Sequence, residues 1–247
     1  MKISITASSR MGCVRSNNED MVLVDQWCVR NGKVRTEVDT DIVDRYLIAL
    51  ADGMGGHNCG EVASSDVLHN LQFFFSDLPV GLNVSDFNET IYEWLSSMNN
   101  IIESKGAYDE RYNKMGTTLV ALAYYGREYY WMNCGDSRIY SFYEGKLTQL
   151  STDHSLSTLV GDTTHSNVIT NCIGGGCKHS FIDIVQCSAD VRPGSSFLLC
   201  SDGLTDMLPV SDIAEMLAAG KSANDLCKEA EKAGGFDNVS AIVATIK

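Results

Sequence analysis

The chain has 247 residues, of which 44% are hydrophobic, and a formal net charge of -13 at pH 7. Because this is enough apolar content for a sizeable core and no stretch has a linker's composition, we expect residues 1–247 to form a single domain. The negative charge repels nucleic-acid backbone and anionic membranes, so neither is an expected partner. An acidic chain can still act on a phosphate if it first binds cations.

The 9 cysteines are scattered without C-x-x-C pairs, which argues against a zinc cluster or a disulfide framework. Several lie in apolar runs, where a free cysteine packs as a small hydrophobe, and this suits a reducing cytosol. Residues 1–10 lack the apolar core of a signal peptide, and no run of about 20 apolar residues could span a membrane. We therefore expect a cytoplasmic protein, and we further expect a monomer.

The first half of the chain predicts short strands followed by two amphipathic helices. Asn31-Gly32 is a hairpin signal after the second strand, and the acidic stretch Glu37–Asp44 predicts a solvated hairpin or loop. Ser85 is a candidate N-cap for the second helix, whose apolar residues recur at helical spacing. The predicted strands are Ile3–Ser8, Met21–Val29 and Tyr46–Ala51, and the predicted helices are Gly60–Phe75 and Ser85–Ser104.

After residue 116 the apolar period changes from helical to strand-like. Gly126-Arg127 and Glu144-Gly145 are expected turns between strands. Antiparallel strands with helices on the outside of the sheets define an α+β fold class. The expected strands are Thr117–Tyr125, Glu128–Cys134, Arg138–Tyr143, Lys146–Leu150, Phe181–Ala189, Ser196–Cys200 and Asn238–Ile246, and the expected helices are Ser211–Ala219 and Ser222–Ala233.

Four aspartates lie at the ends of apolar strands: Asp52, Asp136, Asp202 and Asp237. Each Asp-Gly pair alone is most simply a turn. Four carboxylates brought to one sheet end, however, need cations to offset their repulsion. Oxygen ligands without His or Cys favour Mg²⁺ or Mn²⁺. Two such ions sharing a carboxylate would lower the pKa of a bridging water and neutralise the charge of a phosphate.

Six motifs in order give the chain a family resemblance. With them the sequence resembles the metal-dependent protein phosphatases of type 2C, and Asp-Gly-Met-Gly-Gly-His together with Asp-His-Ser at 153–155 resembles the bacterial branch. The match runs from about residue 8 to the C-terminus. The motifs are Arg15-x-x-Asn18-Glu19-Asp20, Ala51-Asp52-Gly53-Met54-Gly55-Gly56-His57, Gly116-Thr117-Thr118, Gly135-Asp136-Ser137-Arg138, Ser201-Asp202-Gly203-Leu204-Thr205-Asp206 and Asp237-Asn238.

The resemblance implies an α-β-β-α sandwich, in which two antiparallel sheets are flanked by helix pairs and metals lie at one end. It implies a serine/threonine phosphatase that hydrolyses phosphoserine and phosphothreonine by attack of a metal-bridging water or hydroxide on phosphorus. The implied cofactors are two Mn²⁺ or Mg²⁺ ions and a third, weaker one. The implied partners are phosphorylated proteins, substrates of a Ser/Thr kinase whose signalling the enzyme counteracts.

By resemblance, Asp52 would bridge two metals and the Gly53 carbonyl would bind the second. Asp202 and Asp237 would complete the first, and Glu19 and Asp20 would hold metal-bound waters. Asp136 would form the third, weaker position, together with Asp202 and Asp206. The resemblance assigns these residues to the metals: Asp52, Gly53, Asp202, Asp237, Asp20, Glu19, Asp136 and Asp206.

Two further residues have catalytic roles by resemblance, and each has a simpler alternative. Arg15 would bind the substrate phosphate, which suits a fork-shaped guanidinium, or it is an ordinary surface charge. His57 would be the general acid for the leaving alkoxide, or it only packs within a glycine-rich loop. Gly116-Thr117-Thr118 is expected to begin a buried strand, and Asn238 to position Asp237 and the loop backbone.

Two segments depart from compact bacterial members of the family. The stretch from Asp20 to Asp52 is longer, and the flap from His154 to Asn167 is shorter. Within the flap we expect Leu156, Leu159 and Val160 to form one helical turn that docks on the sheet. Two alternatives to a protein phosphatase stay open: a binding module without turnover, and a phosphoesterase for small molecules or nucleotides.

Overall fold

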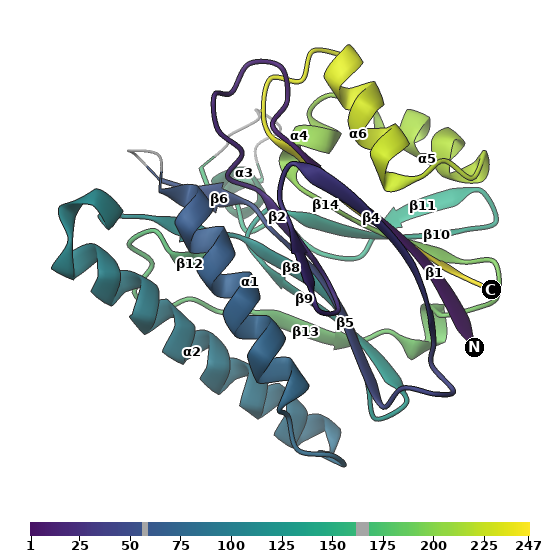
Figure 1. The fold of residues 1–247 in the computed structure, drawn as a ribbon, viewed down its shortest axis with the longest axis horizontal. Helices are drawn as coiled ribbons and strands as arrows, with labels where there is room; N and C mark the ends of the chain where they lie inside the picture. Colours follow the sequence, from purple (N-terminus) through teal and green to yellow (C-terminus); the bar gives the residue numbers. More distant parts are fainter. Residues whose placement is uncertain (56–58, 162–167) are drawn as a thin grey trace.

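The computed structural model describes residues 1–55, 59–161 and 168–247 as two six-stranded antiparallel sheets packed face to face, with helices outside each sheet (Figure 1). A small third sheet is formed by β12 (Ile173–Gly174), β7 (Gly116–Thr117) and β6 (Gly53–Met54). The first large sheet has the order β11 (Lys146–Gln149), β10 (Arg138–Tyr143), β14 (Ser196–Cys200), β15 (Val239–Ile246), β1 (Lys2–Arg10) and β4 (Gly32–Asp39). The second has the order β13 (Asp183–Gln186), β9 (Glu128–Cys134), β8 (Leu119–Tyr125), β5 (Arg45–Ala51), β2 (Met21–Val24) and β3 (Trp27–Val29).

Strand alternation divides the apolar residues into three layers of core. In β5, Leu47 and Ala49 face the helices, whereas Ile48 and Leu50 face the opposite sheet. Residues of both sheets that face inward form the core layer between the sheets. The outer layers lie under α1 (Gly60–Ser76) and α2 (Val84–Tyr108) on one side, and under α4 (Asp202–Thr205), α5 (Val210–Ala218) and α6 (Ala223–Lys232) on the other. The expected α-β-β-α sandwich is confirmed.

The helices α2, α3 and α6 begin where a short polar side chain accepts a hydrogen bond from a free backbone N–H group. The Ser222 and Asp225 side chains form a reciprocal capping box at the start of α6. The predicted N-cap of α2 is wrong, because Asn83 accepts the N–H of Asp86 at 3.0 Å, two residues before Ser85. No helix in the described part of the chain is long and apolar enough to cross a membrane.

The long segment after Asp20 differs from its prediction in two ways. Its single predicted strand is a hairpin of β2 and β3 that turns at Asp25, where φ is +54°. Asn31 is not a hairpin turn, because β3 and β4 belong to different sheets and the chain crosses between them there. The stretch Glu37–Asp44 is only partly loop, since β4 continues to Asp39 and pairs along its length with β1.

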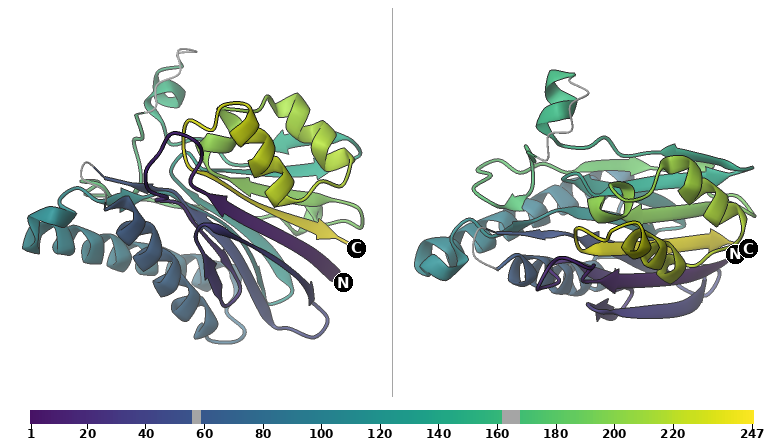
Figure 2. Two further views of the ribbon diagram at one scale, coloured as in Figure 1. Left: turned by 45° about the horizontal axis from the view of Figure 1, so that its top comes forward. Right: turned by 90° about the horizontal axis from the view of Figure 1, so that it is seen from above.

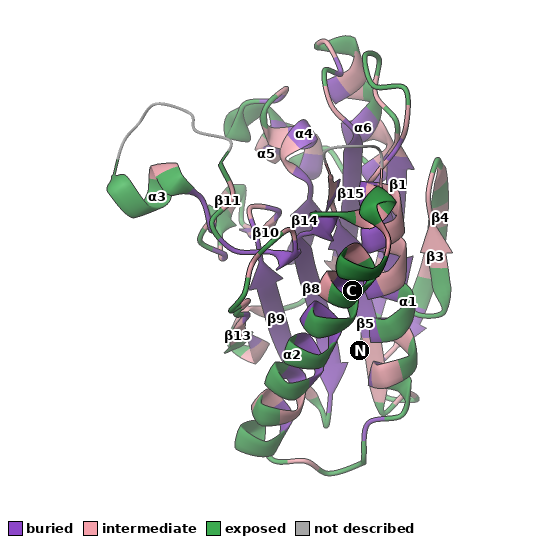
Figure 3. Cartoon of the chain, turned by 90° about the vertical axis from the view of Figure 1, so that its left-hand side faces the viewer, coloured by how far each residue is buried: buried purple, intermediate pink, exposed green. Residues whose placement is uncertain are grey.

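The flap helix α3 (Leu156–Val160) forms, but it does not dock on the sheet as expected. Ser155 caps it, and Leu159 and Val160 are 71% and 63% exposed. The helix projects away from the sandwich (Figures 2 and 3). Its apolar side chains therefore stabilise no core. The rest of the flap, residues 162–167, lies outside the described residues.

Candidate metal centre

The strand registers bring the four predicted aspartates to one end of the sandwich. In the second sheet, Leu50 at the end of β5 pairs with Val120, and Cys134 at the end of β9 pairs with Leu119. In the first sheet, Cys200 at the end of β14 pairs with Ala241 near the start of β15. The aspartate-bearing ends of the two sheets lie on the same side, since Asp202 and Asp237 are near enough to repel the charge of Asp52; the sequence reasoning had expected the end of a single sheet. The aspartates are Asp52, Asp136, Asp202 and Asp237.

Two buried threonines hold the backbone of Asp52. The Asp52 N–H donates to Thr118 Oγ1 at 3.0 Å, and its carbonyl accepts from the Thr118 N–H at 2.9 Å and from Thr117 Oγ1 at 2.8 Å. Thr118 Oγ1 also lies 2.7 Å from Ser137 Oγ, next to Asp136. Gly116-Thr117-Thr118 does begin buried strands, but it also fixes Asp52 relative to the Asp136 loop, which the sequence reasoning missed.

Asp20 is fully buried in the cluster. Its Oδ2 accepts a hydrogen bond from Ser201 Oγ at 2.8 Å, whereas its buried Oδ1 makes none within the described residues. Burial raises the pKa of Asp20 to about 7, although the hydroxyls of Ser240 and Ser201 act in the opposite direction. A buried carboxylate oxygen that accepts no hydrogen bond among the described residues is well suited to a cation or to a water bound to one.

The other carboxylates disfavour one another's charge. Burial, and then repulsion from Asp20, Asp202 and Asp136, raises the pKa of Asp52 well above its usual value. Burial and Asp202 raise the pKa of Asp136 to about 7. Burial raises the pKa of Asp202 to about 6, with repulsion from Asp206 and Asp237 adding to it. These mutual effects show that the carboxylates, including Asp206, lie within electrostatic reach of one another.

Asp237 has a cationic partner on the N-terminal loop. Arg15 Nη2 donates to Asp237 Oδ2 at 2.6 Å, and both side chains are about half exposed. The pKa of Arg15 is raised by this contact and by Glu19 and Asp52, so its guanidinium lies against the cluster. Asn238 holds the same loop, as expected: its Oδ1 accepts the Glu19 N–H and its Nδ2 donates to two loop carbonyls.

Gly53 and Glu19 meet at the start of α1. A Cβ on Gly53 would lie 2.1 Å from the Gly60 carbonyl oxygen and 2.7 Å from that of Glu19, so only glycine fits. Glu19 Oε1 accepts the Gly60 N–H at 3.3 Å, a favourable place for a carboxylate at a helix N-terminus. Burial raises the pKa of Glu19 despite this bond. His57, the expected general acid, lies outside the described residues.

Oxygen-only donors and mutually raised pKa values fit hard divalent cations. In residues 1–55, 59–161 and 168–247, however, no three His, Cys, Asp or Glu side chains are already arranged to hold a metal ion. In this arrangement Arg15 is hydrogen-bonded to Asp237, and the Asp52 carboxyl interacts with those of Asp20 and Asp202. The chemistry of the donor set therefore fits hard cations, although the side chains are not in a ligating arrangement.

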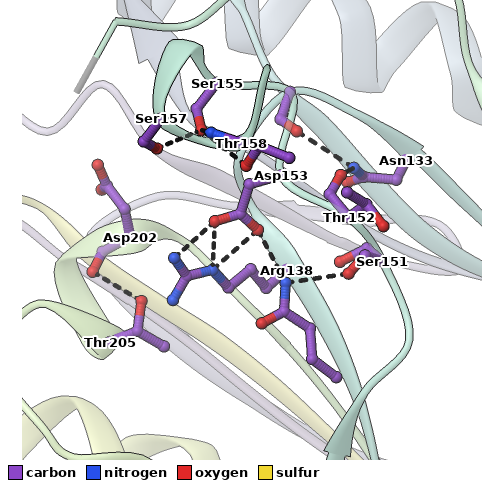
Figure 4. A network of polar contacts seen from close by, with 12 residues as sticks. Asn133, Arg138, Ser151, Thr152, Asp153, Ser155, Ser157, Thr158, Asp202 and Thr205 are labelled. Atoms are coloured by element: carbon purple, nitrogen blue, oxygen red, sulfur yellow. Dashed lines mark hydrogen bonds and ion pairs between the residues drawn. The ribbon is translucent and has the colours of Figure 1, made fainter. Parts of the chain in front are cut away.

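The Asp-His-Ser sequence at 153–155 supports the loop that carries Asp136. The Arg138 guanidinium forms a bidentate pair with Asp153, with Nη2 at 2.6 Å from Oδ2 (Figure 4). His154 Nδ1 accepts the Gly135 N–H at 3.1 Å. On the neighbouring α4, Thr205 Oγ1 donates to the Asp202 carbonyl at 3.2 Å. The sequence motif had signalled only the bacterial branch, and not this supporting role.

The comparisons place the chain among the serine/threonine phosphatases. Residues 38–233 match the family model described as protein phosphatase 2C. PstP of Mycobacterium tuberculosis is 33% identical over 97% of this chain, and PhpP of Streptococcus pneumoniae is 30% identical over 100% of it. The chain belongs to the protein phosphatase 2C family. It covers 98% of PhpP but only 44% of the length of PstP.

Solved structures confirm the same fold. The serine/threonine phosphatase of S. agalactiae superposes with a TM-score of 0.82 at 29% identity, covering 99% of this chain and all of that one. The catalytic domain of PstP, solved in complex with 2 manganese ions, gives a TM-score of 0.75 at 30% identity, with both chains fully covered. The family resemblance stated from the motifs and the fold class are therefore confirmed.

Proposed function

We propose that residues 1–247 form one catalytic domain that hydrolyses phosphoserine and phosphothreonine in proteins, using two Mn²⁺ or Mg²⁺ ions. The cluster of Asp20, Asp52 and Asp202, whose pKa values are all raised, carries this proposal. Such a cluster is costly without counter-charge, which divalent cations supply. The manganese in the PstP catalytic domain supports the same reading.

The chain's own residues would divide the work as follows. Asp52, the Gly53 carbonyl, Asp202 and Asp237 would hold the two cations, with Asp20 and Glu19 supporting their waters. Asp136 would hold a third, weaker cation, with Asp202 and Asp206 beside it. When bound, the cations would supply a water nucleophile and neutralise charge on the phosphate.

Arg15 would bind and orient the phosphate. Its guanidinium already points at the cluster, and its fork of N–H donors matches two phosphate oxygens. His57 would donate a proton to the leaving alkoxide. The natural substrates would be proteins phosphorylated by a Ser/Thr kinase, since the relatives PstP and PhpP are named protein phosphatases. We expect a monomer in the cytoplasm.

Assays with and without metal test the proposal. Phosphoserine and phosphothreonine peptides and p-nitrophenyl phosphate should be hydrolysed with added Mn²⁺ or Mg²⁺, and not after treatment with a chelator. Asp202→Asn should remain folded and lose most of this activity. Full turnover by a thoroughly metal-stripped sample would contradict the metal assignment. Turnover of p-nitrophenyl phosphate or nucleotides but of no phosphopeptide would favour a small-molecule phosphoesterase.

A further inference from the structure

His154 is a buried histidine outside the proposed ligand set, and it joins three segments of the chain. Its side chain is 8% exposed and its ring lies 4.6 Å, centroid to centroid, from that of Phe181. Nδ1 accepts the Gly135 N–H at 3.1 Å, and Nε2 lies 3.1 Å from Asp183 Oδ2. His154 therefore connects the start of the flap with β13 and with the loop between β9 and β10.

The hydrogen bonds assign one tautomer to the ring. Asn171 Nδ2 lies 2.8 Å from His154 Nδ1. The Asn171 amide is oriented by Phe181, whose N–H donates to Asn171 Oδ1 and whose carbonyl accepts from Nδ2. Two N–H groups therefore point at Nδ1, which must carry a lone pair rather than a proton. Nε2 then carries the hydrogen and donates it to Asp183.

The Nδ1 atom of His154 accepts the N–H of Gly135, a residue with little freedom to move. Gly135 has φ of +122°, and a Cβ there would lie 2.7 Å from Cβ and Cγ2 of Thr118. The main chain of His154 also donates to the Gly135 carbonyl at 3.0 Å. His154 thus binds both the N–H and the carbonyl of Gly135, and the next residue along the chain is Asp136.

We propose that His154 is a positioning residue, whose Nδ1 fixes the Gly135 peptide and thereby aims Asp136 at the third cation position. The part concerning the cation rests on the proposed function. Residues that orient a ligand's backbone act on metal affinity without touching the metal, and their loss typically costs about 10-fold to 100-fold. A histidine that served only to fill the core would act through its volume and not through Nδ1.

Two substitutions separate these roles, because each keeps one nitrogen's function. His154→Asn places an amide oxygen near the position of Nδ1, so it can still accept the Gly135 N–H while losing Asp183. His154→Gln places an amide nitrogen near Nε2, so it can still donate to Asp183 while losing the acceptor. The side chain of Asp183 is 40% exposed, and water can replace its lost partner in His154→Asn.

Hydrogen exchange of the metal-free protein tests the geometry alone. The Gly135 amide should exchange about 10-fold or more faster in His154→Gln than in the wild type, because a buried donor loses its acceptor. In His154→Asn its protection should stay close to wild type. His69→Gln, at an exposed position on α1, is the control for histidine loss. Equal deprotection in the Asn and Gln variants would overturn the proposal, since the acceptor would then be irrelevant.

A double-mutant cycle tests whether His154 acts through Asp136. Calorimetric Mn²⁺ titration should show the weaker site lost in Asp136→Ala and weakened about 10-fold in His154→Gln, with the two tighter sites kept. Turnover at limiting Mn²⁺ should fall in both single variants, and the double variant should match Asp136→Ala. Losses that multiply would mean that His154 acts elsewhere.

The two parts of the proposal, that His154 fixes Gly135 and that it thereby aims Asp136 at a third cation, can be contradicted separately. If Asp136→Ala keeps wild-type Mn²⁺ binding and turnover, the third cation position is wrong and the claim about aiming Asp136 at it falls. The exchange of Gly135 in the metal-free protein still decides whether His154 Nδ1 fixes the loop. If His154→Gln does not fold, exchange and Mn²⁺ titration of His154→Asn and Asp183→Asn decide instead. Both should then keep the weaker site, and its loss in His154→Asn would overturn the proposal.

Discussion

Arg15 Nη2 lies 2.6 Å from Asp237 Oδ2, so the residue expected to bind phosphate holds a residue expected to bind a cation. The two roles cannot be fulfilled in this arrangement at the same time. Because both side chains are about half exposed, the ion pair is screened and inexpensive to break. A cation that takes Asp237 would favour release of Arg15, so we expect cation binding to promote phosphate binding.

Arg15→Ala should therefore have opposite effects on the two ligands. The KM for a phosphopeptide should rise, since a charge-assisted contact is typically worth about 1.5–3 kcal/mol. Mn²⁺ affinity should stay equal or increase, because a competing cation has been removed. Steady-state kinetics and calorimetry measure the two effects. Arg15→Lys is the matched control, since it keeps the charge without the fork. Weaker Mn²⁺ binding in Arg15→Ala would instead make Arg15 a support for the site.

The raised carboxylate pKa values predict the pH dependence of stability in the metal-free protein. Asp20 and Asp136 with pKa values of about 7 bind protons in the folded state that they release when unfolded. Unfolding free energy should therefore fall as pH rises from about 4 to about 7, where only the unfolded carboxylates are ionised. Denaturant unfolding across this range measures the slope.

Asp20→Asn is the variant that checks the source of this slope. Asparagine has a shape similar to that of aspartate but does not ionise. The metal-free variant should therefore be more stable than the wild type at pH 7, and its unfolding free energy should change less steeply with pH. Saturating Mn²⁺ should flatten the slope in the wild type, because it favours the ionised carboxylates. A wild-type slope that stays the same in Asp20→Asn would show that other groups titrate.

Gly53→Ala should destabilise the protein or abolish turnover. Its Cβ would meet the backbone of Gly60 at 2.1 Å, and neither β6 nor the start of α1 can move without displacing the Gly53 carbonyl. Gly55→Ala is a close control, because among the described residues its Cβ would have no neighbour nearer than 3.4 Å. Thermal unfolding and turnover are measured for both. Equal behaviour of the two variants would contradict the close contact.

Thr118→Val should lower both stability and activity, whereas Thr118→Ser should restore most of both. Valine keeps the shape but leaves the buried N–H of Asp52 without an acceptor, which typically costs about 1–3 kcal/mol. It also removes the contact with Ser137 beside Asp136. Chemical denaturation and kinetics provide the measurements. A Thr118→Val protein with normal activity would show that Asp52 needs no such support.

Local pattern was enough to predict an α+β fold and most of its elements, whereas the sandwich arrangement was implied by the family resemblance. Helical spacing in α1 and α2 marks the one face of each helix that is buried against the sheet, whereas β5 and β8 are buried on both faces and are short continuous apolar runs. Pattern does not say which strands pair. Asn31 resembles a hairpin turn locally, yet it is the place where the chain changes sheets. The exposure of Leu159 also depends on the path of the flap, which spacing does not fix.

The aspartates of the candidate site were predictable because each follows or precedes an apolar strand. Their supports were not, because hydrogen bonds between distant segments leave no periodic signal. Thr118 and Asp52 are 66 residues apart, and Ser201 and Asp20 are 181 apart. The Arg15–Asp237 pair was missed for a different reason: residue type assigned each to a ligand and gave no indication that they contact one another.

The two terminal strands pair along their whole length, and this determines where any attached polypeptide would emerge. β15 leaves the carboxylates at Val239 and runs antiparallel to β1, so Met1 and Lys247 lie together at the opposite end (Figure 1). Eight residues of strand separate that end from the site, about 25 Å. A tag or surface anchor joined at either terminus would thus leave the end of the sandwich that carries the carboxylates exposed to solution.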